Sequence, residues 1–246
     1  MPLEYYLLFM GLILVCAVFG ASASAKVRSA YRAYGGMPTR SRMTGYDTAQ
    51  RLLRSNGVRG ISVGRVRGML TDHYHPTKGV VNLSDSVYGN YSIAAVAVAA
   101  HEVGHVMQKK KGYFPYKIRS ILVPITNFGS RLALPLVLIG LLMDVFVYAG
   151  QNTSFGYYLA IAGVALYGLS TLFALVTLPV EFDASRRAKK MLVKEGILTE
   201  EELPYASKML SAAAQTYVAS LLTSLVYFLR FAVWVFFIFG GNRRRD

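Results

Sequence analysis

The chain has 246 residues, 54% of them hydrophobic, yet it carries a formal net charge of +14 at pH 7. A mean hydropathy of +0.37 beside so large a positive charge argues against an ordinary water-soluble domain and is typical of apolar membrane spans joined by basic segments. A single cysteine excludes an intrachain disulfide. The basic residues flank the apolar segments without a recognised nucleic-acid-binding motif, so membrane lipids are an expected partner and nucleic acid is not.

Four apolar segments are long enough to cross a bilayer, which predicts a mostly α-helical, multi-pass protein of the cell membrane with about four spans. They cover residues 5–25, 132–150, 155–180 and 219–240. Only the polar residues 151–154 separate the second segment from the third, so these two are expected to form an antiparallel hairpin.

The first apolar segment has features of a secretory signal as well as of an anchor. Its small residues 21–25 offer sites that a signal peptidase cuts. Its leading residues carry Glu4 in place of the positive charges of a signal peptide, which favours an uncleaved anchor.

The region after the anchor predicts an exposed connector over residues 29–45 and a short helix over residues 47–55 that ends at Asn56-Gly57. Short β-like pieces separated by Gly and Pro turn signals then predict a small sheet. These pieces cover residues 60–63, 71–75 and 79–84.

The sheet is followed by an HExxH motif, His101-Glu102-Val103-Gly104-His105. An alanine-rich run leads into the motif, and the lysines and glycine of residues 109–112 end the predicted helix. Histidines four apart project from one helical face, near enough to share a tetrahedral Zn²⁺, while Glu102 lies beside the open coordination position. The motif therefore predicts one zinc ion per chain on His101 and His105, with Glu102 as general base.

A catalytic zinc site needs a third protein ligand, and Glu181 is the best candidate. It stands at the aqueous end of the third apolar segment, where a carboxylate is costly unless it is paired or metal-bound. The alternative is an ion pair of Glu181 with Arg186 or Arg187. Asp183 lies on the other side of the helix and cannot face the same metal, whereas Ser185 shares the face of Glu181 and is a candidate hydrogen-bond partner behind the ligands.

His73 and His75 are the remaining imidazoles. Their spacing on a strand points both the same way, which suggests a metal pair, a substrate-side donor or a group that stabilises the oxyanion. The alternative is that they are surface or turn residues. The strand itself can bind an extended peptide by edge addition, or it can simply complete the core.

The distribution of Lys and Arg predicts the orientation in the membrane. Of the 27 basic residues, 22 fall in residues 26–119 and 181–216, which the hairpin places on one side. Because positive charge marks the cytoplasmic side, the active site is expected there. A full last span would place the basic residues 243–245 on the outside, against this bias. Because Arg230 interrupts this segment near its middle, the alternatives are that the segment is re-entrant, lies in the interface or faces the bundle interior, and the side of the C-terminus stays open.

Five regions are therefore expected along the chain. They are an N-terminal transmembrane anchor (1–25), a cytoplasmic catalytic region (26–120), a transmembrane hairpin (121–180), a cytoplasmic region with the third zinc ligand (181–216) and a C-terminal hydrophobic segment with a basic tail (217–246).

The HExxH motif and the later run Glu181-Phe182-Asp183-Ala184-Ser185, with a hydrophobic hairpin between them, resemble the YugP-type bacterial neutral zinc metallopeptidases. The pattern is more distantly similar to the HtpX-type and CAAX prenyl proteases, whose second motif supplies the third zinc ligand. The resemblance implies a gluzincin-like core of helices with a small sheet beside the membrane. It also implies that Glu181 is the third ligand. Ser185 replaces the final Asp of the relatives' motif.

These patterns predict a zinc metalloendopeptidase whose substrates are peptides of membrane or membrane-proximal proteins. Zinc would lower the pKa of a bound water, and Glu102 would take the water's proton and pass it to the departing amine. Two other classes compete: a scaffold or chaperone that uses zinc only as a clamp, and a metal transporter. The transporter is disfavoured because all four histidines lie outside the apolar spans.

Overall fold

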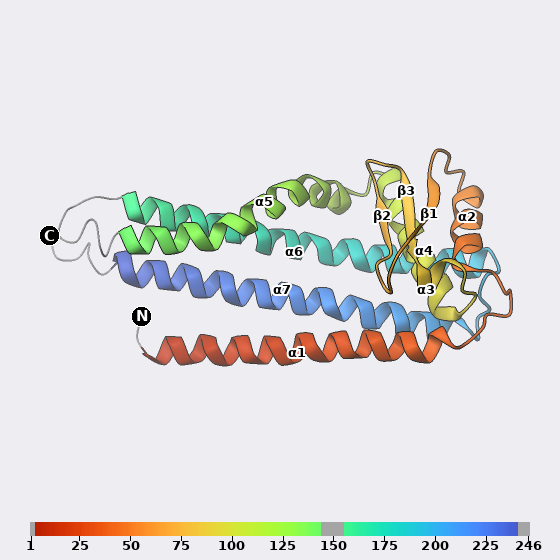
Figure 1. Ribbon diagram of the computed structural model, residues 1–246, viewed down its shortest axis with the longest axis horizontal. Helices are drawn as coiled ribbons and strands as arrows, with labels where there is room; N and C mark the ends of the chain where they lie inside the picture. The colour runs from red at the N-terminus through yellow and green to blue at the C-terminus, as the bar shows by residue number, and fades with distance from the viewer. Residues whose placement is uncertain (1–2, 144–154, 241–246) are drawn as a thin grey trace. The chain divides into compact units, whose positions relative to one another are not determined.

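The computed structural model describes residues 3–143 and 155–240 (Figure 1). The predicted class, mostly helical with a small sheet, is confirmed. In chain order the elements are α1 (Leu3–Gly35), α2 (Gly45–Ser55), β1 (Ser62–Val66), β2 (His73–His75), β3 (Val80–Ser84), α3 (Asp85–Tyr88), α4 (Ile93–Lys110), α5 (Phe114–Leu142), α6 (Phe155–Lys194) and α7 (Leu203–Gly240). The chain divides into a first compact unit of residues 1–20, 118–177 and 218–246 and a second of residues 21–117 and 178–217.

Three helices in the described part of the chain are long and apolar enough to cross a membrane. They contain the first and third predicted spans and most of the fourth. The predicted second span, residues 132–150, runs from α5 into residues 144–154, which lie outside the described residues, as does the basic tail at 243–245. A fourth span and the hairpin turn at 151–154 therefore stay predictions.

The structure corrects the predicted connector and narrows the alternatives for the last apolar segment. Helix α1 continues to Gly35, so the connector predicted from residue 29 begins only after that glycine. The extension is held in place because Tyr31 is buried and its hydroxyl donates a hydrogen bond of 2.9 Å to the carbonyl of Ser86. The last apolar segment is part of one continuous helix, α7, which passes through Arg230 and excludes a re-entrant loop.

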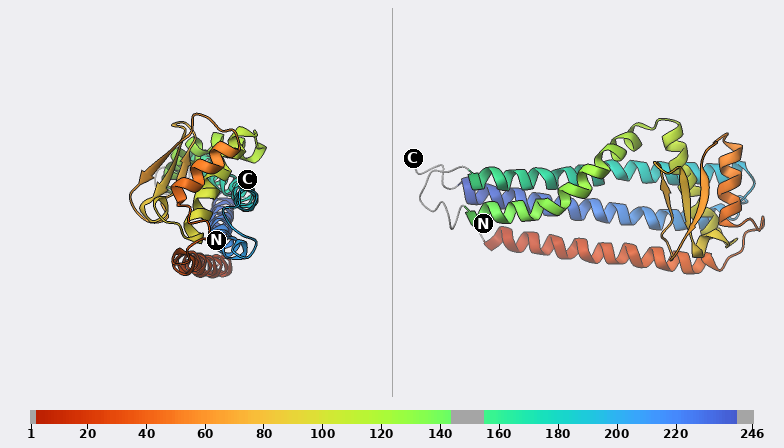
Figure 2. Two further views of the ribbon diagram at one scale, coloured as in Figure 1. Left: turned by 90° about the vertical axis from the view of Figure 1, so that its right-hand side faces the viewer. Right: turned by 45° about the horizontal axis from the view of Figure 1, so that its top comes forward.

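The first unit contains parts of α5, α6 and α7, which run side by side (Figure 2). Val137 of α5, Val164 of α6 and Val235 of α7 are buried in a small core between them. A Cβ at Gly140 would lie 2.6 Å from the carbonyl oxygen of Gly156, so the close approach of α5 and α6 requires glycine at this position.

The sheet of the second unit has the order β1-β3-β2, with β1 parallel and β2 antiparallel to β3. The predicted pieces at 71–75 and 79–84 contain β2 and β3, whereas β1 begins two residues later than its predicted piece at 60–63. Val81 and Leu83 of β3 are fully buried, and they join the core formed with α4. Strand β2 is left at an edge of the sheet.

Helix α4 lies at the centre of the second unit. Ser92 caps its N-terminus by accepting a hydrogen bond from the N–H of Ala95, and the helix ends at Lys110, before Gly112, as predicted. Its alanine side chains are all fully buried. A Cβ at Gly104 would lie 2.6 Å from the carbonyl oxygen of Ala184, so glycine at this position lets α6 pass directly against the HExxH turn.

Candidate metal centre

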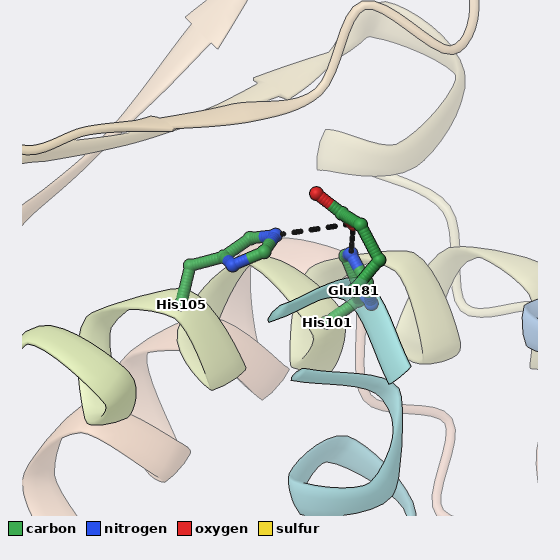
Figure 3. Close-up of side chains that lie close together, drawn as sticks. All are labelled: His101, His105 and Glu181. Carbon is green, nitrogen blue, oxygen red and sulfur yellow. Dashed lines mark hydrogen bonds and ion pairs between the residues drawn. The ribbon is translucent and has the colours of Figure 1, made fainter. Parts of the chain in front are cut away.

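The close packing of α4 and α6 brings together His101, His105 and Glu181 (Figure 3). One ligand atom from each side chain lies within 4.8 Å of the others. The Oε2 atom of Glu181 is 3.1 Å from Nε2 of His101 and 3.6 Å from Nε2 of His105. Glu181 is only 2% exposed, so its carboxylate is buried against the two imidazoles. The side chains predicted as metal ligands thus converge on one point.

The Nδ1 atom of each imidazole, on the side of the ring away from Nε2, also has a hydrogen-bond partner. Nδ1 of His101 lies 3.1 Å from Oγ of Ser185, one helical turn after Glu181. Nδ1 of His105 lies 3.0 Å from Oε1 of Gln108. Because Oε1 can only accept, His105 donates from Nδ1 and keeps the lone pair of Nε2 for the side facing Glu181.

Gln108 was not expected from the sequence, although it lies three residues after His105 on the same face of α4. Its amide nitrogen donates to the carbonyl of Val180 at 2.7 Å and to Oδ2 of Asp183 at 3.0 Å. These two acceptors fix the orientation of the amide, so that Oε1 faces His105. Gln108 is fully buried, so its amide is held in one orientation. It connects His105 of α4 to Val180 and Asp183 of α6 by hydrogen bonds.

Asp183 forms ion pairs with Arg186 and Arg187, the two arginines that the sequence offered as alternative partners of Glu181. Its carboxylate pairs with Arg186 and, at 2.6 Å, with Arg187. Both arginines thus pair with Asp183, whereas Oε2 of Glu181 contacts the two histidines.

Glu102 is buried next to His101, and the backbone of Tyr74 in β2 lies close to its carboxylate. Burial raises the pKa of Glu102 to about 7, and His101 opposes this rise while the carboxylates of Glu181 and Asp72 add to it. A carboxyl group with a pKa near neutrality can both accept and return a proton.

A cavity of about 340 Å³ opens beside Glu102 and His101. Asp72, a second carboxylate not singled out from the sequence, lines it and is held by the N–H of Ser84 at 2.7 Å and the hydroxyl of Ser84 at 2.9 Å. Burial raises the pKa of Asp72. Much of the remaining wall is apolar and includes Val27, Leu70, Val98, Met209, Leu210 and Ala213.

His73 and His75 lie on β2 and make hydrogen bonds within the sheet and its turn. His73 contacts the carbonyl of Thr71 at 2.9 Å and the side chain of Asn82 at 3.0 Å, and His75 accepts from the N–H of Lys78 at 3.3 Å. Among the described residues neither joins the group of metal-ligating atoms or the wall of the cavity. A role of these histidines in catalysis stays a prediction.

Comparison with known proteins identifies the family. A family model described as "Putative neutral zinc metallopeptidase" matches residues 8–236. The chain belongs to this neutral zinc metallopeptidase family. It is also 42% identical over 224 residues to the "Putative membrane protease YugP" of Bacillus subtilis (strain 168), and the match covers 90% of the chain and 95% of that relative. No solved structure was found to match.

Membership of the neutral zinc metallopeptidase family implies zinc, and the residues present fit this metal. Two imidazole nitrogens and one carboxylate oxygen are a common donor set of catalytic zinc sites. Here these atoms lie within 4.8 Å of one another, and the cavity lined by His101 and Glu102 leaves room for water or substrate at one side.

Replacing Gln108 by Leu is expected to weaken zinc binding by about 10- to 100-fold, because His105 would lose the acceptor that orients its ring. The affinity can be measured by competition with a chromophoric zinc chelator. Gln50→Leu, a substitution on the half-buried face of α2, is the matched control. Unchanged zinc affinity in a Gln108→Leu protein with wild-type circular dichroism would show that the amide does not support the site.

Proposed function

We propose that this chain is a membrane-bound, zinc-dependent metalloendopeptidase that hydrolyses peptide bonds of membrane or membrane-proximal proteins. The observation that carries the proposal is the buried convergence of His101, His105 and Glu181 beside a cavity that Glu102 lines. Family membership supports the reaction class. Both histidines and Glu181 would hold the metal, with Ser185 and Gln108 behind the two imidazoles.

Zinc, when bound, supplies a Lewis acid that polarises a peptide carbonyl and lowers the pKa of water. Glu102 accepts the proton of the attacking water and returns it to the departing amine, so one carboxylate acts as base and then as acid. Its burial and its pKa of about 7 suit both roles. No covalent intermediate with the protein is required.

Strand β2 suits the alignment of a substrate. It is an edge strand, and the backbone of Tyr74 lies close to Glu102. An extended peptide can pair with such an edge, which would place its backbone beside the proposed general base. The apolar cavity next to Glu102 would receive a side chain adjacent to the scissile bond.

The position of Glu181 along α6 argues for substrates close to the membrane. It follows the apolar residues 155–180 directly within a single helix, so it is a few ångströms along the axis from the end of that stretch. The excess of Lys and Arg in residues 26–119 and 181–216 favours the cytoplasmic side for the site.

The test compares one unfolded peptide presented in two ways to the enzyme in liposomes: joined to a transmembrane helix, or free in solution. We expect the tethered form to be cleaved at least about tenfold faster, because tethering raises its local concentration at the site. Cleavage should stop with a zinc chelator and return with added zinc. Equal rates for the two forms would reject membrane proximity, and metal-independent cleavage would reject the reaction class.

A further inference from the structure

An arginine interrupts the apolar face of the first unit. Arg230 lies in α7 within the apolar residues 219–240, and its guanidinium lies over the ring of Tyr6 at 5.9 Å from the centroid. Among the residues that the structure describes, no carboxylate forms an ion pair with Arg230. A cation on a membrane-spanning helix is costly unless an anion or water compensates it, so an anionic partner is expected at this position.

Arg230 faces a cavity of about 440 Å³, whose wall also contains Leu3, Tyr6 and Trp234. Trp234 stands one turn after Arg230 on the same face of α7. Tyr6 lies in the first turns of α1, close to the charged Glu4. Tyr and Trp at the end of a span are typical of the membrane interface, where lipid headgroups lie.

The surroundings of this cavity are strongly apolar and exposed. On α1, Leu3 is 70% and Leu7 is 59% exposed, and on α7, Leu229 is 45% and Phe236 is 71% exposed. A free phosphate ion would use only the guanidinium, whereas a phospholipid would place its phosphate on Arg230 and its acyl chains along these side chains. A cation that makes no ion pair within the described part of the chain, two aromatic rings and an adjoining apolar surface together fit an amphiphilic anion.

We propose that the cavity formed by Leu3, Tyr6, Arg230 and Trp234 binds the headgroup of an anionic phospholipid. Arg230 binds the phosphate, the rings of Tyr6 and Trp234 line the headgroup region, and the acyl chains lie against α1 and α7. The site lies in the first unit and is independent of the proposed zinc chemistry.

The protein carries its own reporter, because Trp234 is the single tryptophan of the chain. The full-length protein is reconstituted in mixed bilayers in which either phosphatidylglycerol or phosphatidylcholine carries brominated acyl chains, which quench nearby tryptophan. We expect a relative binding constant about fivefold in favour of phosphatidylglycerol, falling to about one in Arg230→Gln and largely kept in Arg230→Lys.

Arg131→Gln is the matched control, because it removes an exposed arginine from α5 in the same unit and leaves the cavity intact. The ratio between the two lipids within each variant cancels changes in the tryptophan's own emission. An equal ratio in wild type and Arg230→Gln overturns the proposal, as does loss of the preference in Arg131→Gln, which would indicate general charge attraction. If an excess of inorganic phosphate abolishes the preference, the site binds free phosphate and the lipid assignment is wrong. Zinc content, measured in parallel, should be the same in all variants.

Discussion

Glu102→Gln is expected to keep about one zinc per chain and to lose about 10²- to 10⁴-fold in kcat. The amide has nearly the same shape as the carboxylate but cannot accept the proton of the attacking water. Because Glu102 lies beside the group of ligand atoms without belonging to it, the metal should remain bound. The measurement is hydrolysis of a fluorogenic unfolded peptide by the detergent-purified protein, with zinc determined by atomic emission on the same sample.

Glu200→Gln is the control for this substitution, because it makes the same change at an exposed position. It should leave both activity and zinc unchanged. If Glu102→Gln retained full cellular function with its zinc, the chain would act as a scaffold or chaperone and the metal would serve only as a clamp. A loss of zinc in Glu102→Gln would instead mean that this carboxylate helps to hold the metal.

Glu181→Ala is expected to weaken zinc binding by more than about 100-fold, because it removes a ligand outright, whereas loss of a hydrogen bond behind a ligand already costs about 10- to 100-fold. The substitution also leaves His101 and His105 facing an empty volume where the 2%-exposed carboxylate was. Zinc per chain, compared with the parent protein after dialysis against a weak chelator, measures the effect.

Glu200→Ala serves as the control for the loss of a carboxylate, and far-UV circular dichroism checks that α4 and α6 still form. Equal zinc in Glu181→Ala and the parent would place the third ligand elsewhere, with Asp183 or the pair His73 and His75 as the next residues to substitute. Absence of zinc from both proteins would contradict the peptidase proposal itself.

The parts of the site that follow from spacing on one helix could be predicted from the sequence. His101 and His105 share a face of α4 because they are four residues apart, and Ser185 shares the face of Glu181 for the same reason. Apolar length predicted about four spans, and three helices in the described part of the chain are long and apolar enough to cross a membrane. Each of these inferences needs only the helical period or the helical rise. The period and the rise are the same whatever packs against the helix.

The ends of helices and strands were predicted less well where a contact between residues distant in the sequence determines them. Helix α1 passes into the predicted connector because Tyr31 reaches the carbonyl of Ser86, a contact that no local pattern encodes. Strand β1 begins at Ser62 because it pairs with β3 in a particular register, in which Ser62 is opposite Val80. Backbone pairing between distant segments determined these ends.

What the amino-acid sequence determined by itself is the chemistry available: two histidines and a glutamate on one turn, a later acidic helix, and apolar spans around them. Tertiary structure decided which of those groups meet. Glycine at position 104 lets α6 approach α4 closely, and that contact brings Glu181 to the histidines and Asp183 to Gln108. The fold also placed Tyr74 and Asp72 near Glu102. These contacts join side chains that are distant in the sequence. The helical period relates only neighbours on one helix, so it could not predict them.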